Sequence, residues 1–591
     1  MIILGINEGH NCSASLIKDG KLVSAVCEER FTRIKGQDGY PENAIQYCLK
    51  EGQITEGDVD LIATATQEVT PEVLVNGKYT KFTIDDWIRE NNEYFKPVLI
   101  EKKNVDYMKI FPRIPVKHYD FSFMDKEPDQ TKWAQLFKEE RLRNLVQRFK
   151  ISQDKIIFVD HHTCHAYYAY FMSPYRNNVL VITADSWGDG CNCSIWVANG
   201  KKVELKFKSA NNSLARLYRY ITLLLGMKPQ EHEYKVMGLA PYCTDYQMKK
   251  PYEIFKNTLY VDGLDFKYNV KPTDSYFWFR EKLEGCRFDG IAGGLQRYVE
   301  DVMETWVKNI LATFPSNTVV YSGGLALNIK INKRLSELSE IKNIFVPSGG
   351  GDESISIGAA AYVSNEQDKQ NSVEPPLHDY LGPRVDPSTI ETVLEKKGRK
   401  SDFIIKHGIS NREIAEYLSR NLIVARCKGR SEFGPRSLGN RSILANPSDA
   451  QNIRKINNQI KYRDFWMPFT PSILIERASD YVVNPKNIPS PFMTIAFEST
   501  PLARRDLAAA IHPSDFTVRP QFVEEKYNHD YHNLIKQFEK ITGIGGLLNT
   551  SLNLHGEPVV GSTEDAIHTL VNSDLDAMLI EDVFILRKTS C

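Results

Sequence analysis

The chain has 591 residues, 42% of them hydrophobic and 25% charged, which is long enough for two large domains and excludes a disordered or fibrous composition. Its 74 Lys and Arg nearly balance its 75 Asp and Glu, and the net charge of -1 excludes long-range attraction to nucleic acid or to an anionic membrane. We therefore expect a small-molecule substrate, with no nucleic-acid partner and no membrane partner.

The ten cysteines are scattered without a CxxC pair, a pattern typical of reduced thiols in a cytoplasm. The first residues form an apolar strand pattern without the basic stretch of a signal peptide. No apolar run approaches the roughly 20 residues that span a bilayer. The expected location is cytoplasmic.

The first elements predicted along the chain are a strand, a polar turn and a hairpin. Residues 2–6 are apolar, and two alternating segments then meet at Asp19 and Gly20. The same order recurs from residue 178, with a second hairpin at Asn199-Gly200. Such a long-range repeat is the plan of the actin-like ATPase fold, in which two duplicated halves bind a nucleotide between their turns.

A third segment fits this plan, because a strand runs into a glycine turn at Gly323 and Gly324 and then into a helix after Asn328. Turns of this kind present backbone N–H groups to phosphate or ribose. A polar, proline-ended stretch from Asn365 to Pro376 predicts a linker. The strands and amphipathic helices that follow, including a strand expected at 492–497, predict a separate α/β or α+β domain.

The clearest candidate site is a pair of histidines in the segment DHHTCHAYYAY. His161 and His165 are four residues apart and therefore project from one face of a helix, as two ligands of one metal would. A packed helix face is the structural alternative. Asp185 and Asp352, each at a turn where the two halves meet, complete a set of donors that suits iron, manganese or zinc.

A further histidine and a lysine lie near the first glycine turn. His10 is a candidate general base for an attacking hydroxyl, because imidazole takes up a proton near neutral pH. A solvated turn histidine is the alternative. Lys35 could contact a phosphate or be an exposed loop lysine.

The second domain carries a basic, glycine-rich loop, CKGRSEFGPRSLGNRS, whose glycines and proline exclude a regular helix. Arginine forks match phosphate oxygens. Nucleic-acid binding is the rival interpretation, but interleaved exposed aromatic residues and excess charge are missing. The residues expected to form a pocket for a small phosphorylated anion and nucleotide phosphates are Lys428, Arg430, Arg436, Arg441, Lys461, Arg463, Arg519, Asn549, Ser551 and Asn553.

Several ordered motifs together resemble the NodU/CmcH carbamoyltransferases of natural-product biosynthesis along essentially the whole chain. They are GHNCSASLIKDGKLVSAVCEERFTRIK, DHHTCHA, EYKVMGLAPY, YSGGLALN, GGGDES, GRSEFGPRSLGNRSILA, IKYRDFWMPFTPSIL and NTSLNLHGEP. The resemblance implies an α/β chain with a duplicated actin-like domain at 1–365 and a YrdC-like domain at 366–591. The first is similar to the actin-like domain of the tRNA threonylcarbamoyl transferases.

The resemblance also implies a reaction in two steps. Carbamoyl phosphate and ATP would give carbamoyl-adenylate in the C-terminal domain, and the N-terminal domain would pass the carbamoyl group to a hydroxyl of a natural product, such as an antibiotic or toxin. The family's ligands for iron(II) fall on His161, His165, Asp185 and Asp352, and its base falls on His10. Lys35 matches a nucleotide-phosphate lysine, and Arg436, Lys461, Arg519 and Ser551 match residues for carbamoyl phosphate.

Two positions depart from the family pattern. Met467 stands where arginine is usual, so Arg463 is expected to compensate, and Cys243 stands where glycine is usual. An actin-like small-molecule kinase is the alternative function; it would need a carboxylate base and Mg²⁺ but not the two histidines. The sequence leaves the acceptor open among aminoglycosides, cephems, macrolides, ansamycins, Nod factors and guanidinium alkaloids. A homodimer is the default oligomeric state.

Overall fold

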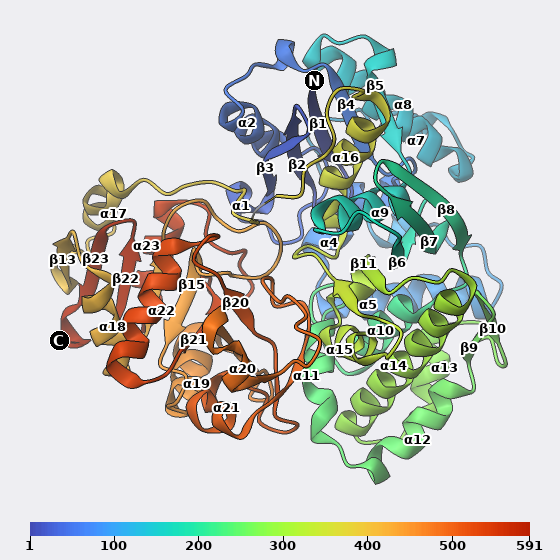
Figure 1. Ribbon diagram of the computed structural model, residues 1–591. Helices are drawn as coiled ribbons and strands as arrows, with labels where there is room; N and C mark the ends of the chain where they lie inside the picture. Colours follow the sequence, from blue (N-terminus) through green and yellow to red (C-terminus); the bar gives the residue numbers. More distant parts are fainter. Residues whose placement is uncertain (377, 591) are drawn as a thin grey trace. The chain divides into compact units, whose positions relative to one another are not determined.

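The computed structural model (Figure 1) describes residues 1–376 and 378–590. It consists of two compact units, the first made of Met1–Glu28 and Gly36–Pro375 and the second of Glu29–Lys35 and Pro376–Cys591. The linker expected from Asn365 begins later than the sequence indicates. Helix α16 (Ile355–Gln367) continues through Asn365, which is buried.

The first sheet of unit 1 has the strand order β3-β2-β1-β4-β5. β1 pairs antiparallel with β2 and parallel with β4, and β4 pairs parallel with β5. The predicted hairpin is present, and Asp19 and Gly20 have φ of 51° and 78°, which a two-residue turn matching the strand twist requires. The strands are β1 (Ile2–Asn7), β2 (Ser13–Lys18), β3 (Lys21–Cys27), β4 (Leu61–Ala65) and β5 (Ile156–Val159).

The second sheet repeats this topology, with the order β12-β11-β6-β7-β8. Again a strand enters a hairpin and pairs on its other side with a parallel strand, β11. This shared topology confirms the duplicated actin-like fold. The strands are β6 (Val179–Gly188), β7 (Cys191–Asn199), β8 (Lys202–Ser209), β11 (Thr318–Ser322) and β12 (Asn343–Phe345).

Two buried helices connect the sheets. α9 (His161–Met172) packs on β6, α16 packs on β1, and the two helices pack against each other. The contact is close because Gly358 of α16 has no side chain: a Cβ there would lie 1.8 Å from the carbonyl oxygen of Cys164 on α9. The remaining helices of the unit lie between β3 and β5 and between β8 and β12 in the chain. These are α2 (Glu42–Glu51), α3 (Pro71–Val75), α4 (Lys78–Lys81), α5 (Ile84–Glu90), α6 (Tyr107–Ile110), α7 (Phe123–Lys126), α8 (Trp133–Phe149), α10 (Leu214–Leu224), α11 (Glu233–Leu239), α12 (Asp245–Lys256), α13 (Ser275–Lys282), α14 (Phe288–Thr313) and α15 (Ile329–Glu337), with a small hairpin of β9 (Leu259–Asp262) and β10 (Asp265–Tyr268).

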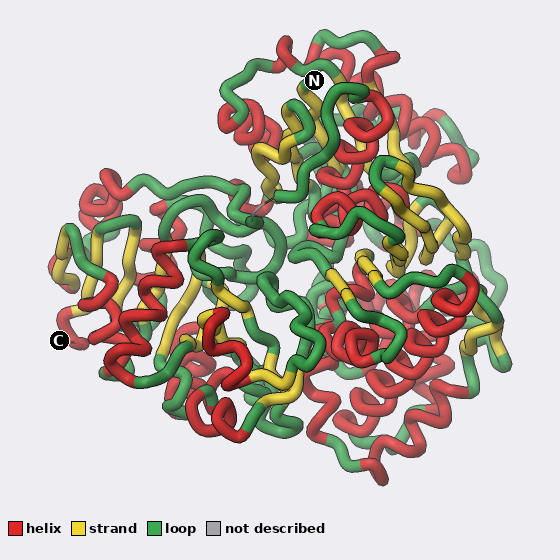
Figure 2. The backbone as a smooth tube through the Cα atoms, in the orientation of Figure 1, coloured by secondary structure: helices red, strands yellow, loops and turns green. Residues whose placement is uncertain are grey.

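Unit 2 is built on a mixed eight-stranded sheet with the order β13-β23-β22-β14-β15-β21-β16-β20. Figure 2 shows helices lying beside the strands of this sheet. Its strands are β13 (Phe403–His407), β14 (Val424–Cys427), β15 (Arg441–Ala445), β16 (Thr470–Leu474), β20 (Gln521–Val523), β21 (Gly546–Ser551), β22 (Ala577–Ile580) and β23 (Val583–Arg587). A small sheet contains β17 (Val482–Val483), β18 (Phe497–Ser499) and β19 (Thr517–Val518). The helices are α17 (Ile390–Lys396), α18 (Asn411–Ser419), α19 (Gln451–Ile456), α20 (Ala478–Tyr481), α21 (Pro501–Asp506), α22 (His529–Thr542) and α23 (Thr563–Val571). This is the separate α/β domain that the sequence predicts.

The prediction of a strand at 492–497 is wrong, because β18 begins only at Phe497. Met493 has φ of 57°, a left-handed conformation that a continuous strand does not tolerate.

A short segment from the N-terminal part of the chain belongs to unit 2. It contains α1 (Glu29–Thr32). Arg30 donates to the carbonyl oxygen of Gly434 at 3.0 Å, and Arg33 donates to the carbonyls of Pro558 and Val559, each at 2.7 Å. Arg33 also pairs with Asp565 at 3.3 Å. These contacts hold Lys35, the last residue of the segment, on the C-terminal unit.

Candidate active site

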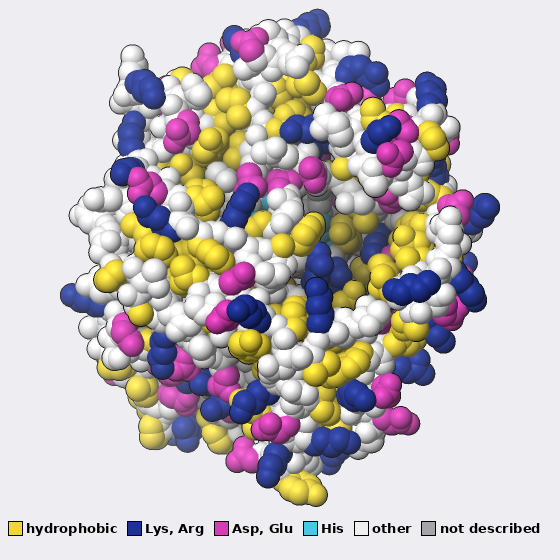
Figure 3. Space-filling model, turned by 90° about the vertical axis from the view of Figure 1, so that its right-hand side faces the viewer, with side chains coloured by type: hydrophobic (Ala, Val, Ile, Leu, Met, Phe, Trp, Pro, Cys, Tyr) yellow, Lys and Arg dark blue, Asp and Glu magenta, His cyan; other side chains and the backbone are white. Residues whose placement is uncertain are grey.

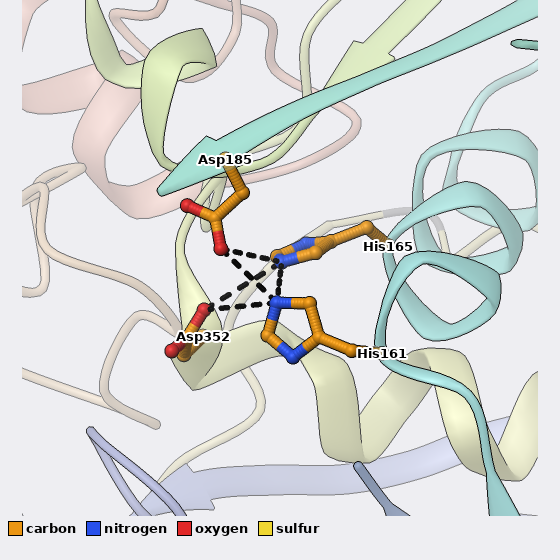
Figure 4. Close-up of side chains that lie close together, drawn as sticks. All are labelled: His161, His165, Asp185 and Asp352. Atoms are coloured by element: carbon orange, nitrogen blue, oxygen red, sulfur yellow. Dashed lines mark hydrogen bonds and ion pairs between the residues drawn. The ribbon is translucent and has the colours of Figure 1, made fainter. Parts of the chain in front are cut away.

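The structure brings His161, His165, Asp185 and Asp352 together in unit 1 (Figure 4). One potential ligand atom from each residue lies within 4.8 Å of all the others. The two histidines come from the first turns of α9, Asp185 from β6, and Asp352 from the turn before α16. Segments far apart in the chain thus meet at one point where the two halves join.

The short distances lie between the imidazole Nε2 atoms and the carboxylates. His161 Nε2 is 3.0 Å from Asp185 Oδ2 and 3.7 Å from Asp352 Oδ1. His165 Nε2 is 3.7 Å and 3.6 Å from the same two oxygens. Both histidines and Asp185 are buried, whereas 24% of the Asp352 side chain is exposed, so the cluster can be reached from the Asp352 side.

The other ring nitrogens face hydroxyl groups. His161 Nδ1 lies 3.0 Å from Thr66 Oγ1, and His165 Nδ1 lies 3.4 Å from Ser322 Oγ. With each Nδ1 as donor, the lone pair of Nε2 points at the centre of the cluster, which is the usual orientation of metal-bound histidine.

The charges of the cluster favour a cation at its centre. Burial alone would lower the pKa of His165, but hydrogen bonds and charge from Asp185 and Asp352 raise it to about 9. Burial likewise opposes charge on Asp185, yet the two histidines hold its pKa well below the ordinary value. Two imidazoles and two carboxylates are ligands that a divalent transition metal accepts, so the residues fit such an ion.

Glycines allow the close approach of these side chains. A Cβ at Gly188 would lie 2.1 Å from Cγ of His161, and a Cβ at Gly324 would lie 2.7 Å from Asp185 Oδ1. The backbone N–H of Gly324 donates to that same oxygen at 3.0 Å. Gly323 adopts φ of 98°, and a Cβ there would lie 2.2 Å from the carbonyl oxygen of Ala184. The two turn glycines, whose predicted role is to face a nucleotide, thus lie directly beside this cluster of histidines and aspartates.

Asn328, grouped with those glycines from the sequence, caps helix α15. Its Oδ1 accepts from the N–H groups of Lys330 and Ile331, and its Nδ2 donates to Gln296 at 2.9 Å. These contacts occupy its amide and explain its position without a ligand.

His10 lies on the loop after β1, and its ring is 4.6 Å from the ring of Tyr79 between centroids. Asn7, which is completely buried, connects this loop to the metal cluster: its Nδ2 donates to the carbonyl of His10 at 3.0 Å and to that of Asp352 at 2.9 Å. Asn7 and Thr66 are site residues that were not predicted from the sequence. Each is a polar residue at the end of an apolar strand, which was the available signal.

Five basic residues form a separate cluster in unit 2. Burial lowers the pKa of Arg519 well below its ordinary value, and the charges of Arg436 and Arg463 lower it further. Burial has the same effect on Lys461, where Arg463 and Lys35 add to it. Positive charges that repel one another in this way would be stabilised by an anionic ligand, and arginine side chains are suited to phosphate oxygens.

Ser551 lies beside this cluster, and Lys461 Nζ donates to its hydroxyl at 3.2 Å and to Asn553 Oδ1 at 2.6 Å. Met467 is buried near the same segment, and Arg463 is one of the clustered cations. That Arg463 compensates for the arginine usual at position 467 stays a prediction.

Two predicted anion ligands belong to the framework of the loop. The terminal nitrogens of Arg441 donate to the backbone carbonyls of Lys428, Asn440, Pro383 and Gly429 at 2.7 to 3.3 Å, and its side chain is completely buried. Asn549 donates to the carbonyl of Ser437 and to the hydroxyl of Ser472. Both side chains therefore have hydrogen-bond partners within unit 2, and their predicted contact with an anion stays a prediction.

Comparison with known proteins agrees with this arrangement of two units. Residues 2–361 match the model of the carbamoyltransferase N-terminus, and residues 415–587 match that of the carbamoyltransferase C-terminus. The uncharacterized protein MJ1051 of Methanocaldococcus jannaschii is 30% identical, covering 99% of this chain and 100% of its own length. Nodulation protein NolNO of Sinorhizobium fredii is 30% identical over 98% of this chain and 79% of that protein.

A solved structure of full-length HypF, in a phosphate- and nucleotide-bound form, aligns with 63% of this chain and 56% of its own, at 14% identity and a TM-score of 0.30.

Among the described residues, no helix has the length and apolar character that crossing a membrane requires. With both family models matched in order and a relative aligned along nearly the whole chain, this protein belongs to the carbamoyltransferase family and is an enzyme.

Proposed function

We propose that the enzyme is an ATP-dependent O-carbamoyltransferase acting on a small-molecule hydroxyl, with carbamoyl phosphate as the carbamoyl source. Unit 2 would form carbamoyl-adenylate, and unit 1 would transfer the carbamoyl group to the acceptor. The observation that carries the proposal is the presence of two distinct sites. One unit holds a cluster of basic residues in which burial and neighbouring charges lower the pKa values of Lys461 and Arg519, and the other holds a set of potential metal ligands beside a histidine.

The first step requires a site for several phosphate groups. Water first hydrolyses carbamoyl phosphate to carbamate and inorganic phosphate. This hydrolysis is needed because carbamoyl-adenylate contains no phosphorus from carbamoyl phosphate. A carbamate oxygen then attacks the α-phosphorus of ATP, and the bond from this phosphorus to pyrophosphate breaks. Lys35, Arg436, Arg463 and Arg519 would bind the phosphate oxygens, whose negative charge would offset the mutual repulsion of these cations.

The second step places the acceptor hydroxyl beside His10. The hydroxyl oxygen attacks the carbamoyl carbon, its proton passes to His10, and the bond from that carbon to the AMP oxygen breaks. An imidazole is suited to accept this proton near neutral pH. Asn7 holds the loops of His10 and Asp352 together, which fixes the base relative to the ligand cluster.

His161, His165, Asp185 and Asp352 would hold one divalent metal ion, for which iron(II) is the candidate given by the family resemblance. When bound, the ion would supply positive charge that stabilises the departing phosphate. Metal analysis of protein purified without oxygen, compared between wild type and His165→Ala, tests this assignment. Equal metal content in the two would contradict it.

Two variants separate the steps. His165→Ala should still consume ATP and carbamoyl phosphate but transfer no carbamoyl group, whereas Arg436→Ala should stop adenylate formation. His529→Ala and Arg412→Ala are matched controls, because both side chains are 76% exposed. Full transfer by metal-free His165→Ala, or normal ATP consumption by Arg436→Ala, would contradict the proposed roles.

A further inference from the structure

The region beside His10 contains buried hydrogen-bonding atoms that the protein leaves unused. Among the described residues, Glu90 Oε2, Gln230 Oε1 and Asp38 Oδ2 are buried and have no hydrogen-bond partner. Unpaired buried polar atoms are costly, so their concentration in one region indicates a place where a polar ligand or water completes the hydrogen bonds.

Hydrogen bonds and the electrostatic surroundings of Tyr79 together indicate that these groups belong to one region. Lys78 Nζ donates to Glu90 Oε1 at 2.6 Å, and Tyr107 Oη donates to the same oxygen at 2.7 Å. Arg219 and Gln230 both act on the phenol of Tyr79: burial raises its pKa, and these two neighbours oppose the shift. The charge of Asp38 also acts on Tyr79. Tyr79 is thus the centre of the region.

Tyr79 also connects this region to the site of the proposed transfer. Its ring centroid lies 4.6 Å from that of His10, and the charge of Asp352 acts on its phenol. Helix α10 borders both places. Arg216, three residues before Arg219 and therefore on the same side of the helix, donates from Nε to the carbonyl of Ser186 at 3.1 Å, directly after the ligand Asp185. A molecule bound at Arg219 would therefore lie within reach of the reacting centre.

Among the described residues of this region, two arginines lie outside any ion pair. Lys78 is neutralised by Glu90, but neither Arg216 nor Arg219 forms an ion pair with any residue in the described part of the chain. Burial raises the pKa of Asp38 and Glu233 to about 7, so these carboxyl groups offer only partial compensation near neutral pH. Figure 3 shows a hollow on one face of the molecule in which histidine atoms are visible, with Lys or Arg side chains at its rim.

We propose that Arg219 binds an oxyanion of the acceptor, so that the natural acceptor is a hydroxyl compound that also carries a carboxylate or a phosphate. This inference rests on the proposed carbamoyl transfer and specifies its substrate class. Tyr79 and Gln230 would donate or accept further hydrogen bonds from the same molecule. The charge of Glu90 acts on Arg219 without forming an ion pair with it. A guanidinium outside an ion pair is suited to this task because its planar N–H groups match both oxyanions.

The test offers the enzyme matched hydroxyl compounds, with ATP and carbamoyl phosphate present, and quantifies carbamoylated products by mass spectrometry. The pairs are glucuronate with glucose, glycerate with glycerol, and glucose 6-phosphate with methyl glucoside. Wild type should modify at least one anionic member about tenfold or more faster than its neutral partner. Arg219→Gln should lose that preference, and Arg219→Lys should retain part of it.

Two controls distinguish a failure of the Arg219 assignment from a failure of the proposed carbamoyl transfer. Arg297→Gln, whose side chain is 52% exposed, should behave as wild type. Pyrophosphate release without any acceptor should continue in Arg219→Gln, and its loss would mean that the variant impairs adenylate formation and would overturn the assignment. Failure of pyrophosphate release in wild type would contradict the proposed function itself.

AMP affinity, measured by calorimetry, distinguishes the acceptor's oxyanion from the phosphate of the adenylate. Unchanged AMP affinity in Arg219→Gln supports the acceptor as the ligand, whereas an equal loss would place Arg219 in the nucleotide site and overturn the inference. Preference for neutral acceptors would overturn it. So would the absence of every anionic product while pyrophosphate release is intact.

Discussion

Arg141 Nε donates to Glu8 Oε2 at 2.7 Å, and neither side chain exposes any surface. Arg141 also donates to the carbonyl oxygens of Ala65 and Thr66, at 3.1 and 2.9 Å. Thr66 in turn contacts the ring of His161, and Glu8 lies on the loop that carries His10. One buried ion pair therefore supports both the metal ligands and the predicted base.

Arg141→Met should destabilise unit 1 by about 3–5 kcal/mol, because it leaves the buried Glu8 carboxylate without its partner. Urea unfolding measures this change. Arg113→Met is the control: Arg113 pairs with the exposed Asp125, and its loss should cost at most about 1 kcal/mol. Similar small effects for both variants would mean that the buried pair does not support the site.

Gly188→Ala should reduce metal binding, because its Cβ would lie 2.1 Å from the ring of His161 and displace that ligand. Metal content per protein checks this expectation. In Gly57→Ala, by contrast, the nearest atom to the new Cβ is 3.9 Å away, so wild-type metal content is expected. A Gly188→Ala protein that still folds and retains its full metal complement would disprove the packing argument.

Arg519→Gln should leave the melting temperature without ligand unchanged or higher, because it removes one of several mutually repelling cations. Stabilisation by carbamoyl phosphate should nevertheless fall. For wild type this stabilisation would be about 2.7 kcal/mol at a hundred times the dissociation constant. Thermal unfolding with and without carbamoyl phosphate measures both effects, with the exposed Arg412→Gln as control. An undiminished ligand effect would exclude Arg519 from the anion site.

Acid should lower the stability of the basic loop of unit 2. Partial burial would raise the pKa of Asp530, but Arg426 and Lys428 outweigh it and lower the pKa to about 2. Because the folded-state pKa is depressed, the stabilisation is present above the unfolded value of about 4 and is lost as pH falls through about 2. Solvent screening limits it to about 1 kcal/mol.

Arg426 also donates to the carbonyl of Gly439 in that loop, at 2.6 Å. Asp530→Asn should therefore remove this part of the acid dependence, as followed by unfolding between pH 5 and pH 2 at constant salt. Parallel stability curves for Asp530→Asn and wild type across this range would contradict the assignment.

Much of the architecture could be predicted because it depends on local patterns. The two hairpins follow from alternating strands and turn residues, and the spacing of His161 and His165 follows from helix geometry. The membership of Glu29–Lys35 in unit 2 could not be predicted, because it depends on tertiary contacts of Arg30 and Arg33. Similarly, a loop arginine that binds anions and one that binds backbone carbonyls, as Arg441 does, have the same local sequence signature.

The most direct test of the account is incubation of the purified enzyme with ATP and carbamoyl phosphate, without an acceptor, followed by mass spectrometry. The account predicts AMP, pyrophosphate and carbamoyl-adenylate, with pyrophosphate appearing only when both substrates are present. Formation of ADP, or ATP turnover without carbamoyl phosphate, would contradict it and favour a kinase or ATPase of the same fold.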